Sequence, residues 1–296
     1  MSNAYLSVHE YLNRVTGLST SALVGNVMRC GAVAQGATSL TVTPVLTVAL
    51  NQYDQVTILD GANSEVLIVG SAGAIVGASN IPVSATQYAH NAGTSCCSDG
   101  TSGSLAEAII EGSASLESIT RQALLQATYT LEMLPMPTTR AWVDSSRQLT
   151  IRPRQFPVQS VSAVNVLYGM ATLNLDVTNA LIDSIGRMVT FSTLSTTGGG
   201  NTLPFSGGGL SQATDGFIQM TYSAGYAYSA LPSIIKRACT LLVSDILADV
   251  FNPTGAASVQ MGKRNVAQYL RGDLSGESAL VKQARHWLRL YTQDAL

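Results

Sequence analysis

The stretch that decides the fold is Phe217-Ile218-Gln219-Met220-Thr221-Tyr222-Ser223-Ala224-Gly225-Tyr226, which is followed closely by Leu231-Pro232. Residues 217–222 alternate and are rich in residues that favour strands, so they predict a β-strand. Glycine tolerates the backbone angles of a sharp turn, and a proline at the first helical position presets φ without losing a hydrogen bond. The stretch therefore predicts a strand, a turn at Gly225 and a helix that starts at Pro232.

Helical periodicity continues downstream and recurs elsewhere in the chain. After Pro232 the apolar face comprises Ile235, Ala238, Cys239, Leu242, Ile246 and Val250. Further helices are predicted for 1–17, for the residues after a Ser-x-x-Glu capping box at Ser104–Glu107, for 115–134 and for 275–291. Pro135 and Pro137 are expected to end the third of these.

Two other regions have the residue pattern of β-strands. Residues 27–98 form short alternating runs separated by turn residues, and residues 142–217 do the same around two glycine triplets, 198–200 and 207–209. We predict an α+β fold: a bundle of about four helices, a β-hairpin excursion at about 140–222, and an inserted small β-barrel or sandwich. The predicted domains are a core of 1–26 and 99–296 and an insertion at 27–98. No repeat with a solenoid period is visible.

The composition suits a protein that buries much of its surface against neighbouring chains. Charged residues are only 11% of the chain and hydrophobic residues 46%, whereas a typical soluble domain has about 25% charged residues. The net charge of −2 gives no overall footprint for nucleic acid. Basic residues exceed acidic ones only after Leu231, so an anionic partner is expected there. The absence of long apolar runs and of a signal peptide predicts a protein without a membrane span that assembles in the bacterial cytoplasm.

The sequence offers no clear chemistry. The three histidines, His9, His90 and His286, have no cysteine or carboxylate at a ligand or triad spacing. The glycine triplets lack the motif of a phosphate-binding loop. Calcium binding by Asp54, Asp60 and Glu65 is an alternative to simple turn chemistry, and the Cys96-Cys97 pair is interpreted as reduced and structural. We predict no catalytic, cofactor-binding or metal-binding residue and no enzymatic activity.

Two groups of basic residues are candidate contact sites. Arg147, Arg152 and Arg154 flank Pro153 and are candidates to contact DNA phosphates or a neighbouring carboxylate, with a solvated edge strand as the alternative. Lys263, Arg264 and Arg271 form the second group, where partner contact and solvation remain open.

The order of several segments resembles the head-tail connector, or adaptor, family of tailed bacteriophages. In that family a last strand ends in Tyr-x-x-Gly-Tyr and leads through a proline into a long helix, as Tyr222 to Tyr226 and Pro232 do here. The stretch 156–164, which contains Pro157-Val158-Gln159-Ser160-Val161, is similar to the family's Pro-Val-x-Ser-Val strand. The matched parts cover about 104–296, while compact members of the family lack the 27–98 block.

The resemblance implies a structural ring subunit of the virion that docks beneath the portal, joins the capsid to the tail and extends the DNA channel. It implies a ring of about twelve copies, a portal partner, a tail or neck protein below, non-specific contact with packaged DNA and no cofactor. The portal would contact Lys263, Arg264, Tyr269 and Arg271. Neighbouring subunits would pack through Ile235, Leu242, Ile246 and Trp287. The DNA channel or tail would meet Arg147, Arg152, Arg154, Gly199 and Gly208.

Two other functions remain as alternatives. The chain would be a different neck or tail component, or a module that binds glycans through the β block, if aromatic residues gathered there. A hydrolase of cell wall or polysaccharide would need paired acids in a cleft, and only Glu107 and Glu111 share a helix face.

Overall fold

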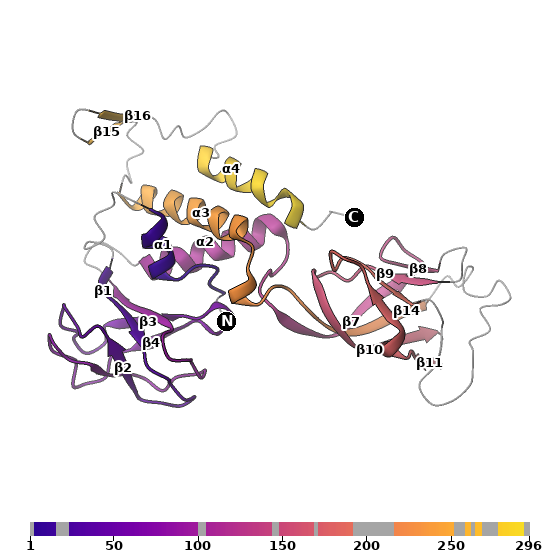
Figure 1. Ribbon diagram of the computed structural model, residues 1–296, viewed down its shortest axis with the longest axis horizontal. Coiled ribbons are helices and arrows are strands. Elements are labelled where there is room, and N and C mark those ends of the chain that lie inside the picture. Colours follow the sequence, from indigo (N-terminus) through magenta and orange to yellow (C-terminus); the bar gives the residue numbers. More distant parts are fainter. Residues whose placement is uncertain are drawn as a thin grey trace. The chain divides into compact units, whose positions relative to one another are not determined.

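The computed structural model describes residues 3–15, 24–99, 105–143, 148–168, 171–191, 216–251, 258–261, 264–267 and 278–292. The chain divides into two compact units (Figure 1). The first contains Met1–Arg121 and Leu231–Thr292, and the second is built from Gln122–Ala230. None of the helices in the described ranges is both long enough and apolar enough to cross a bilayer.

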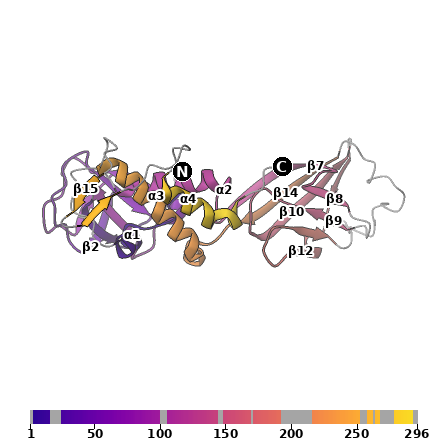
Figure 2. The same cartoon turned by 90° about the horizontal axis from the view of Figure 1, so that it is seen from above.

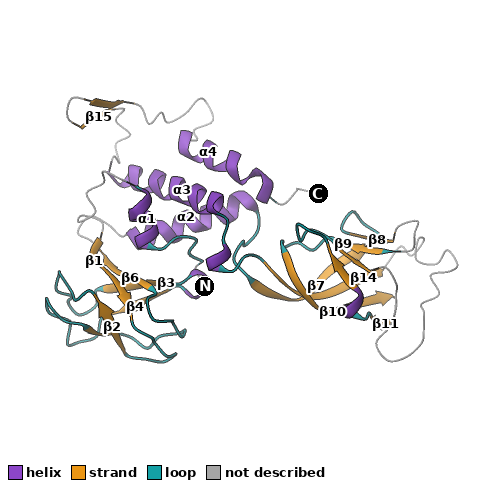
Figure 3. Ribbon diagram, viewed as in Figure 1, coloured by secondary structure: helices purple, strands orange, loops and turns teal. Residues whose placement is uncertain are grey.

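The described residues are mostly β-structure, with strands β1 to β16 against four α-helices (Figure 3). The predicted α+β fold, a helical bundle with a β-hairpin excursion and an inserted barrel or sandwich, is therefore wrong. The helix expected at 115–134 is part of the error. Helix α2 (Leu105–Thr120) ends at Thr120, and Ala127–Met136 is strand β7.

The pairing of β7 explains this error. Thr128, Tyr129 and Thr130 favour strands, and the segment pairs with β14 (Gly216–Ala224) from Ala127↔Ala224 to Met136↔Gly216. The long ladder of hydrogen bonds to β14 thus favours a strand more than the helical spacing of the apolar residues favours a helix. Pro135 is tolerated because β7 lies at the edge of its sheet.

The β block of the first unit is a six-stranded antiparallel sheet in the order β4-β3-β6-β1-β2-β5. Its strands are β1 (Val24–Cys30), β2 (Ser39–Thr43), β3 (Gln55–Leu59), β4 (Glu65–Ile68), β5 (Asn80–Pro82) and β6 (Ser95–Asp99). A bridge between Val69 and Val83 joins the two strands at the ends of this order, so the sheet curls until its edges meet. We call this block the barrel.

The barrel is made of two copies of one pattern, here named the first repeat (24–59) and the second repeat (65–99). Strands β1, β2 and β3 correspond to β4, β5 and β6. The amide of Val42 donates to the carbonyl of Ser79 (2.7 Å), and in the matching bond the amide of Val83 donates to Thr38 (2.9 Å).

The correspondence extends to bridges and turns. The Val33↔His90 bridge matches Leu50↔Ala74, and Tyr53 and Gly93 share a positive φ, of 73° and 90°. The barrel therefore has an internal pseudo-twofold axis, which the sequence analysis did not detect because few side chains are the same in the two repeats.

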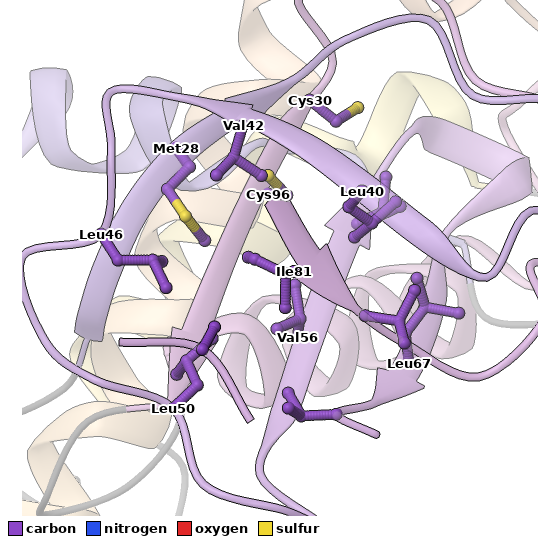
Figure 4. Packing of buried hydrophobic residues seen from close by; sticks show 14 of the residues in the cluster. Met28, Cys30, Leu40, Val42, Leu46, Leu50, Val56, Leu67, Ile81 and Cys96 are labelled. Carbon is purple, nitrogen blue, oxygen red and sulfur yellow. The ribbon is translucent and has the colours of Figure 1, made fainter. Parts of the chain in front are cut away.

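The barrel has its own apolar core, drawn in Figure 4. Alternation in β2 sends Leu40 and Val42 inward, and Val56 and Ile58 from β3 meet them there. Met28 and Cys96 come from the paired strands β1 and β6. Burial of these side chains stabilises the barrel, by about 1.5–3 kcal/mol for each large one.

Helices α1 (Val8–Arg14), α2, α3 (Ser233–Phe251) and α4 (Ala279–Leu288) complete the first unit (Figure 2). The predicted helix after Pro232 is confirmed, and the terminal helices are shorter than expected. Ser7 and Glu10 form a capping box that starts α1. Lys236 of α3 donates to Glu10 (2.5 Å), which fastens α1 to α3.

Helix α2 lies against α3 and α4. Gly112 lets α2 and α3 approach closely, since a Cβ there would lie 2.7 Å from Val243 Cγ2. The predicted capping box at Ser104 includes a residue outside the described ranges. Strands β15 (Ser258–Met261) and β16 (Arg264–Ala267) lie between α3 and α4 in the sequence.

The second unit contains two four-stranded antiparallel sheets that share one apolar core. One has the order β11-β10-β14-β7, with β10 (Val158–Tyr168) and β11 (Ala171–Asn174). The other has the order β12-β13-β9-β8, with β8 (Ala141–Val143), β9 (Leu149–Ile151), β12 (Ala180–Ile182) and β13 (Val189–Phe191). The strand texture predicted for 142–217 is confirmed, but it builds a packed unit rather than a hairpin.

Candidate interaction surfaces

The predicted subunit-interface residues lie on α3 and α4, and two of them pack in the interior of the first unit. Ile235 and Leu242 are buried within this one chain, with exposed fractions of 0% and 3%. Ile246 and Trp287 are half-buried. The Arg237 guanidinium lies 4.9 Å from the centre of the Trp287 ring, a cation–π contact that orients this tryptophan.

A shallow groove runs between α2, α3 and α4. It is lined by Ser115, Ser118, Ile119, Leu242, Asp245, Ile246 and Val281. Four apolar side chains, two serines and one carboxylate line it. Ile246, a predicted contact residue, is therefore placed where a neighbouring chain can reach it.

The predicted DNA or tail contacts Arg152 and Arg154 have partners inside the second unit. Arg152 lies 5.2 Å from the centre of the Trp142 ring. Glu132 accepts a hydrogen bond from the Arg154 amide (3.1 Å) and lies 3.5 Å from its Nε. The Arg154 side chain is 62% exposed.

Glu132 also holds a buried tyrosine. Tyr222, on β14, donates its hydroxyl to Glu132 and stacks on Tyr129 with ring centres 5.4 Å apart. Burial raises the pKa of Tyr222, and the Glu132 carboxylate adds to this effect. The Tyr222 hydroxyl therefore stays protonated and serves as a structural donor.

Several predicted contact residues lie outside the described residues: Arg147, Gly199, Gly208, Lys263, Tyr269 and Arg271. Arg264 is described only as a backbone position in β16. Their roles as portal, DNA or tail contacts stay predictions.

The structure joins His90 to Asp60 and Glu65, which the sequence analysis had not linked to it. His90 has a fully buried side chain, and its Nδ1 lies 2.9 Å from Asp60 Oδ2 while its Nε2 lies 2.7 Å from Glu65 Oε1. Burial lowers the pKa of His90, but the hydrogen bonds and charges of Glu65 and Asp60 outweigh this, so the pKa lies above 6.5. This arrangement favours an imidazolium that donates to both carboxylates.

The first repeat of the barrel has uncharged residues at the positions equivalent to Glu65 and His90. Glu65 corresponds to Asn26: the amide of Gln87 donates to Glu65 Oε2 (2.7 Å), and the amide of Thr47 donates to Asn26 Oδ1 (2.8 Å). His90 corresponds to Leu50. No spacing signal in the sequence marks this cluster, and only an alignment of the two repeats would have found it.

The acidic residues of the alternative calcium site have other partners. Asp60 and Glu65, two members of the alternative calcium site, hold His90, and the Asp54 carboxylate accepts from the Asn51 amide (2.7 Å). Among the described residues no group of His, Cys, Asp or Glu is placed to hold a metal ion. Glu107 of α2 is exposed and its neighbour Glu111 is likewise exposed.

No model of a protein family matches the chain. No curated protein matches it either. Among solved structures, a chain of the "Virion of native gene transfer agent (GTA) particle" is 15% identical, with a TM-score of 0.35, and the match covers 65% of this chain and 78% of that chain.

Two neck structures match over the same 65% of this chain. A chain of the "Neck of empty GTA particle computed with C6 symmetry" is 15% identical over 78% of its length, with a TM-score of 0.34. A chain of the "Neck of native GTA particle computed with C12 symmetry" is 18% identical over 84% of its length, with a TM-score of 0.33. These neighbours are components of phage-like particles, but TM-scores this low do not establish a shared fold.

Proposed function

We propose that the chain is a structural subunit of the neck of a tailed phage-like particle, a head-tail adaptor that forms a ring beneath the portal. The observation that carries this proposal is the way in which its connector-like segments fit together. Strand β14 ends at Ala224, the next residue Gly225 has a φ of +100°, and α3 begins at Ser233 directly after Pro232.

The second connector-like segment is the direct partner of the first. Strand β10 pairs with β14 from Val158↔Ala224 to Tyr168↔Gly216. The Gly225 amide donates to the Pro157 carbonyl (2.9 Å), and the Gln159 side chain donates to the Gly225 carbonyl (3.0 Å). Segments that are far apart in the sequence thus form one unit at the strand-to-helix turn.

The low charge and the partly exposed Ile246 and Trp287 support an assembled state. In a ring each copy offers the same surface to its neighbour, so weak contacts add up around the axis. The subunit works mechanically: it closes the joint between portal and tail around the DNA path. The surplus of basic residues after Leu231 fits an acidic partner such as a portal surface.

The test is binding of the purified chain to the portal oligomer encoded beside it, followed by mass photometry and negative-stain imaging. We expect rings, alone or on the portal. The triple variant Lys263→Glu/Arg264→Glu/Arg271→Glu should lose portal binding. The charge-matched control Arg14→Glu/Arg121→Glu/Arg289→Glu should keep it.

A wild-type chain that remains monomeric and has no affinity for the portal would contradict the proposal. Equal binding by the triple variant and its control would move the docking site away from Lys263, Arg264 and Arg271.

A further inference from the structure

The two repeats of the barrel place different residues at equivalent surface positions. The large-residue rim is exposed and apolar, and it consists of Val45, Val48, Tyr53, Ile75 and Val76, with exposed fractions of 47%, 50%, 73%, 78% and 60%. Their counterparts are Ala85, Tyr88, Gly93, Ala34 and Gln35. We call this surface the small-residue rim after Ala34, Ala85 and Gly93, although Tyr88 and Gln35 are larger than Val48 and Val76, to which they correspond.

The loops of the large-residue rim are continuous with one another. The amide of Ala74 donates to Leu50 (2.8 Å), and that of Gly77 donates to Leu46 (2.9 Å). The turn with Ile75 and Val76 is thus bonded to the segment with Val45 and Val48, and Tyr53 lies three residues after Leu50. The rim is one surface and not a set of scattered side chains.

The fold itself does not require these large residues. Three of the five equivalent positions carry alanine or glycine instead: Ala85 and Gly93 in the second repeat and Ala34 in the first. A soluble protein rarely exposes a contiguous apolar patch unless a partner covers it. The difference between the rims therefore points to a partner and not to folding.

Two charged residues of the barrel, Arg29 and Asp54, differ between the rims. Arg29 is the only Lys or Arg in 24–99. It is exposed, and its guanidinium donates to the Gly93 carbonyl (2.9 Å), which places it at the small-residue rim. Asp54 follows Tyr53 at the large-residue rim. The counterparts of Arg29 and Asp54 are Ile68 and Thr94, which are uncharged. Of these two charges, the small-residue rim therefore carries that of Arg29 and the large-residue rim that of Asp54.

We propose that the large-residue rim of one copy of this chain docks onto the small-residue rim of the next copy. Tyr53 then covers the surface around Gly93 of the next copy, and Asp54 approaches its Arg29. The pseudo-twofold axis carries one rim onto the other, so the rims face different sides of the barrel. Such a contact runs head to tail and leads to a closed ring or a filament, not to a twofold dimer.

This inference deepens the proposed function and rests on it only for ring closure. Its first test is charge reversal, with self-association measured by sedimentation up to about 1 mM chain, where a contact with a Kd of about 1 mM is substantially populated. We expect Asp54→Arg and Arg29→Asp each to weaken association by about tenfold or more, because each places like charges together across the contact. The combined variant should regain most of the affinity.

The second test exchanges residues between the rims. Tyr53→Gly and Gly93→Tyr use residues that the other repeat already accepts at nearly the same φ, and a Cβ at Gly93 meets nothing within 4 Å. Both variants should remain folded and associate less, the first by losing bulk and the second by filling the space that receives it. Glu111→Arg on α2 is the control and should associate as the wild type does.

The outcomes of these two tests distinguish failure of the rim contact from failure of the proposed ring function. Rings that form equally well in the single charge-reversal variants would overturn the rim contact and leave the proposed function standing. Single variants that weaken association without rescue in the combined variant would also overturn it, as would a wild-type chain that is monomeric at the highest concentration.

Discussion

At the scale of single residues, the structure depends on a few positions whose partners are far away in the sequence. His90 bridges Asp60 and Glu65, and Tyr222 donates to Glu132. Buried polar groups of this kind cost several kcal/mol when one partner is removed. Their contribution to the fold is visible only once the strands are paired.

The His90 cluster predicts a pH-dependent stability. Its pKa is raised in the folded chain, so its contribution is fully present below the unfolded pKa of about 6.5 and is lost as the pH rises through the folded pKa. We expect the free energy of unfolding of the barrel to fall over that window, as measured by urea denaturation at a series of pH values.

The control is Glu65→Asn/His90→Leu, which gives the second repeat the residues of the first. Cys30, whose pKa is lowered by a hydrogen bond from Cys96, is kept in both proteins. A pH dependence of the same size in this variant would rule out His90 as its source.

Gly225 provides a second prediction at this scale. A Cβ there would lie 2.5 Å from the Leu125 carbonyl oxygen, and its φ is +100°. Gly225→Ala should therefore lower the free energy of unfolding by about 1–3 kcal/mol. Gly36→Ala is the control, because its φ is also positive, at +81°, while nothing lies within 4 Å of the added Cβ. Equal losses in the two variants would show that backbone strain alone matters.

At the scale of elements, close packing of α2 on α3 fixes the helical part of the first unit. Gly112 faces Val243, and Ser113 lies 3.8 Å from the Cys239 sulfur, where burial raises the thiol pKa to about 12. The small residues of α2 thus match the apolar face of α3.

Gly112→Leu should push these helices apart and destabilise the unit by about 1–3 kcal/mol, as overpacking does in other cores. Ala114→Leu adds a similar volume at an exposed position of the same helix and should have little effect. Thermal denaturation of both variants checks the difference, and an equal shift in Tm would argue against the close approach.

At the scale of the whole molecule, the chain separates into two units with separate cores. Helix α4 belongs to the first unit, where Ala284 and Leu288 are fully buried. Its loss should therefore affect one unit and leave the other unchanged.

Leu288→Ala should lower the stability of the first unit by about 2–5 kcal/mol, while Ile218→Ala should lower that of the second by a similar amount. Hydrogen exchange followed by mass spectrometry should show each loss of protection in its own unit. Loss of protection in both units after a single substitution would mean that they unfold together.

The sequence determined the local elements. Pro232 and the apolar spacing after it predicted α3, Gly225 predicted the turn, and alternation predicted the strands of 27–98 and 142–217. These features act within a few residues, so they can be identified without knowing what packs against them.

Tertiary structure decided the rest. Strand β7 forms because β14 offers it a ladder, although its residues have helical spacing. The His90 cluster, the pseudo-twofold barrel and its two unlike rims exist only once the repeats pair, because pairing brings together residues that no local pattern relates.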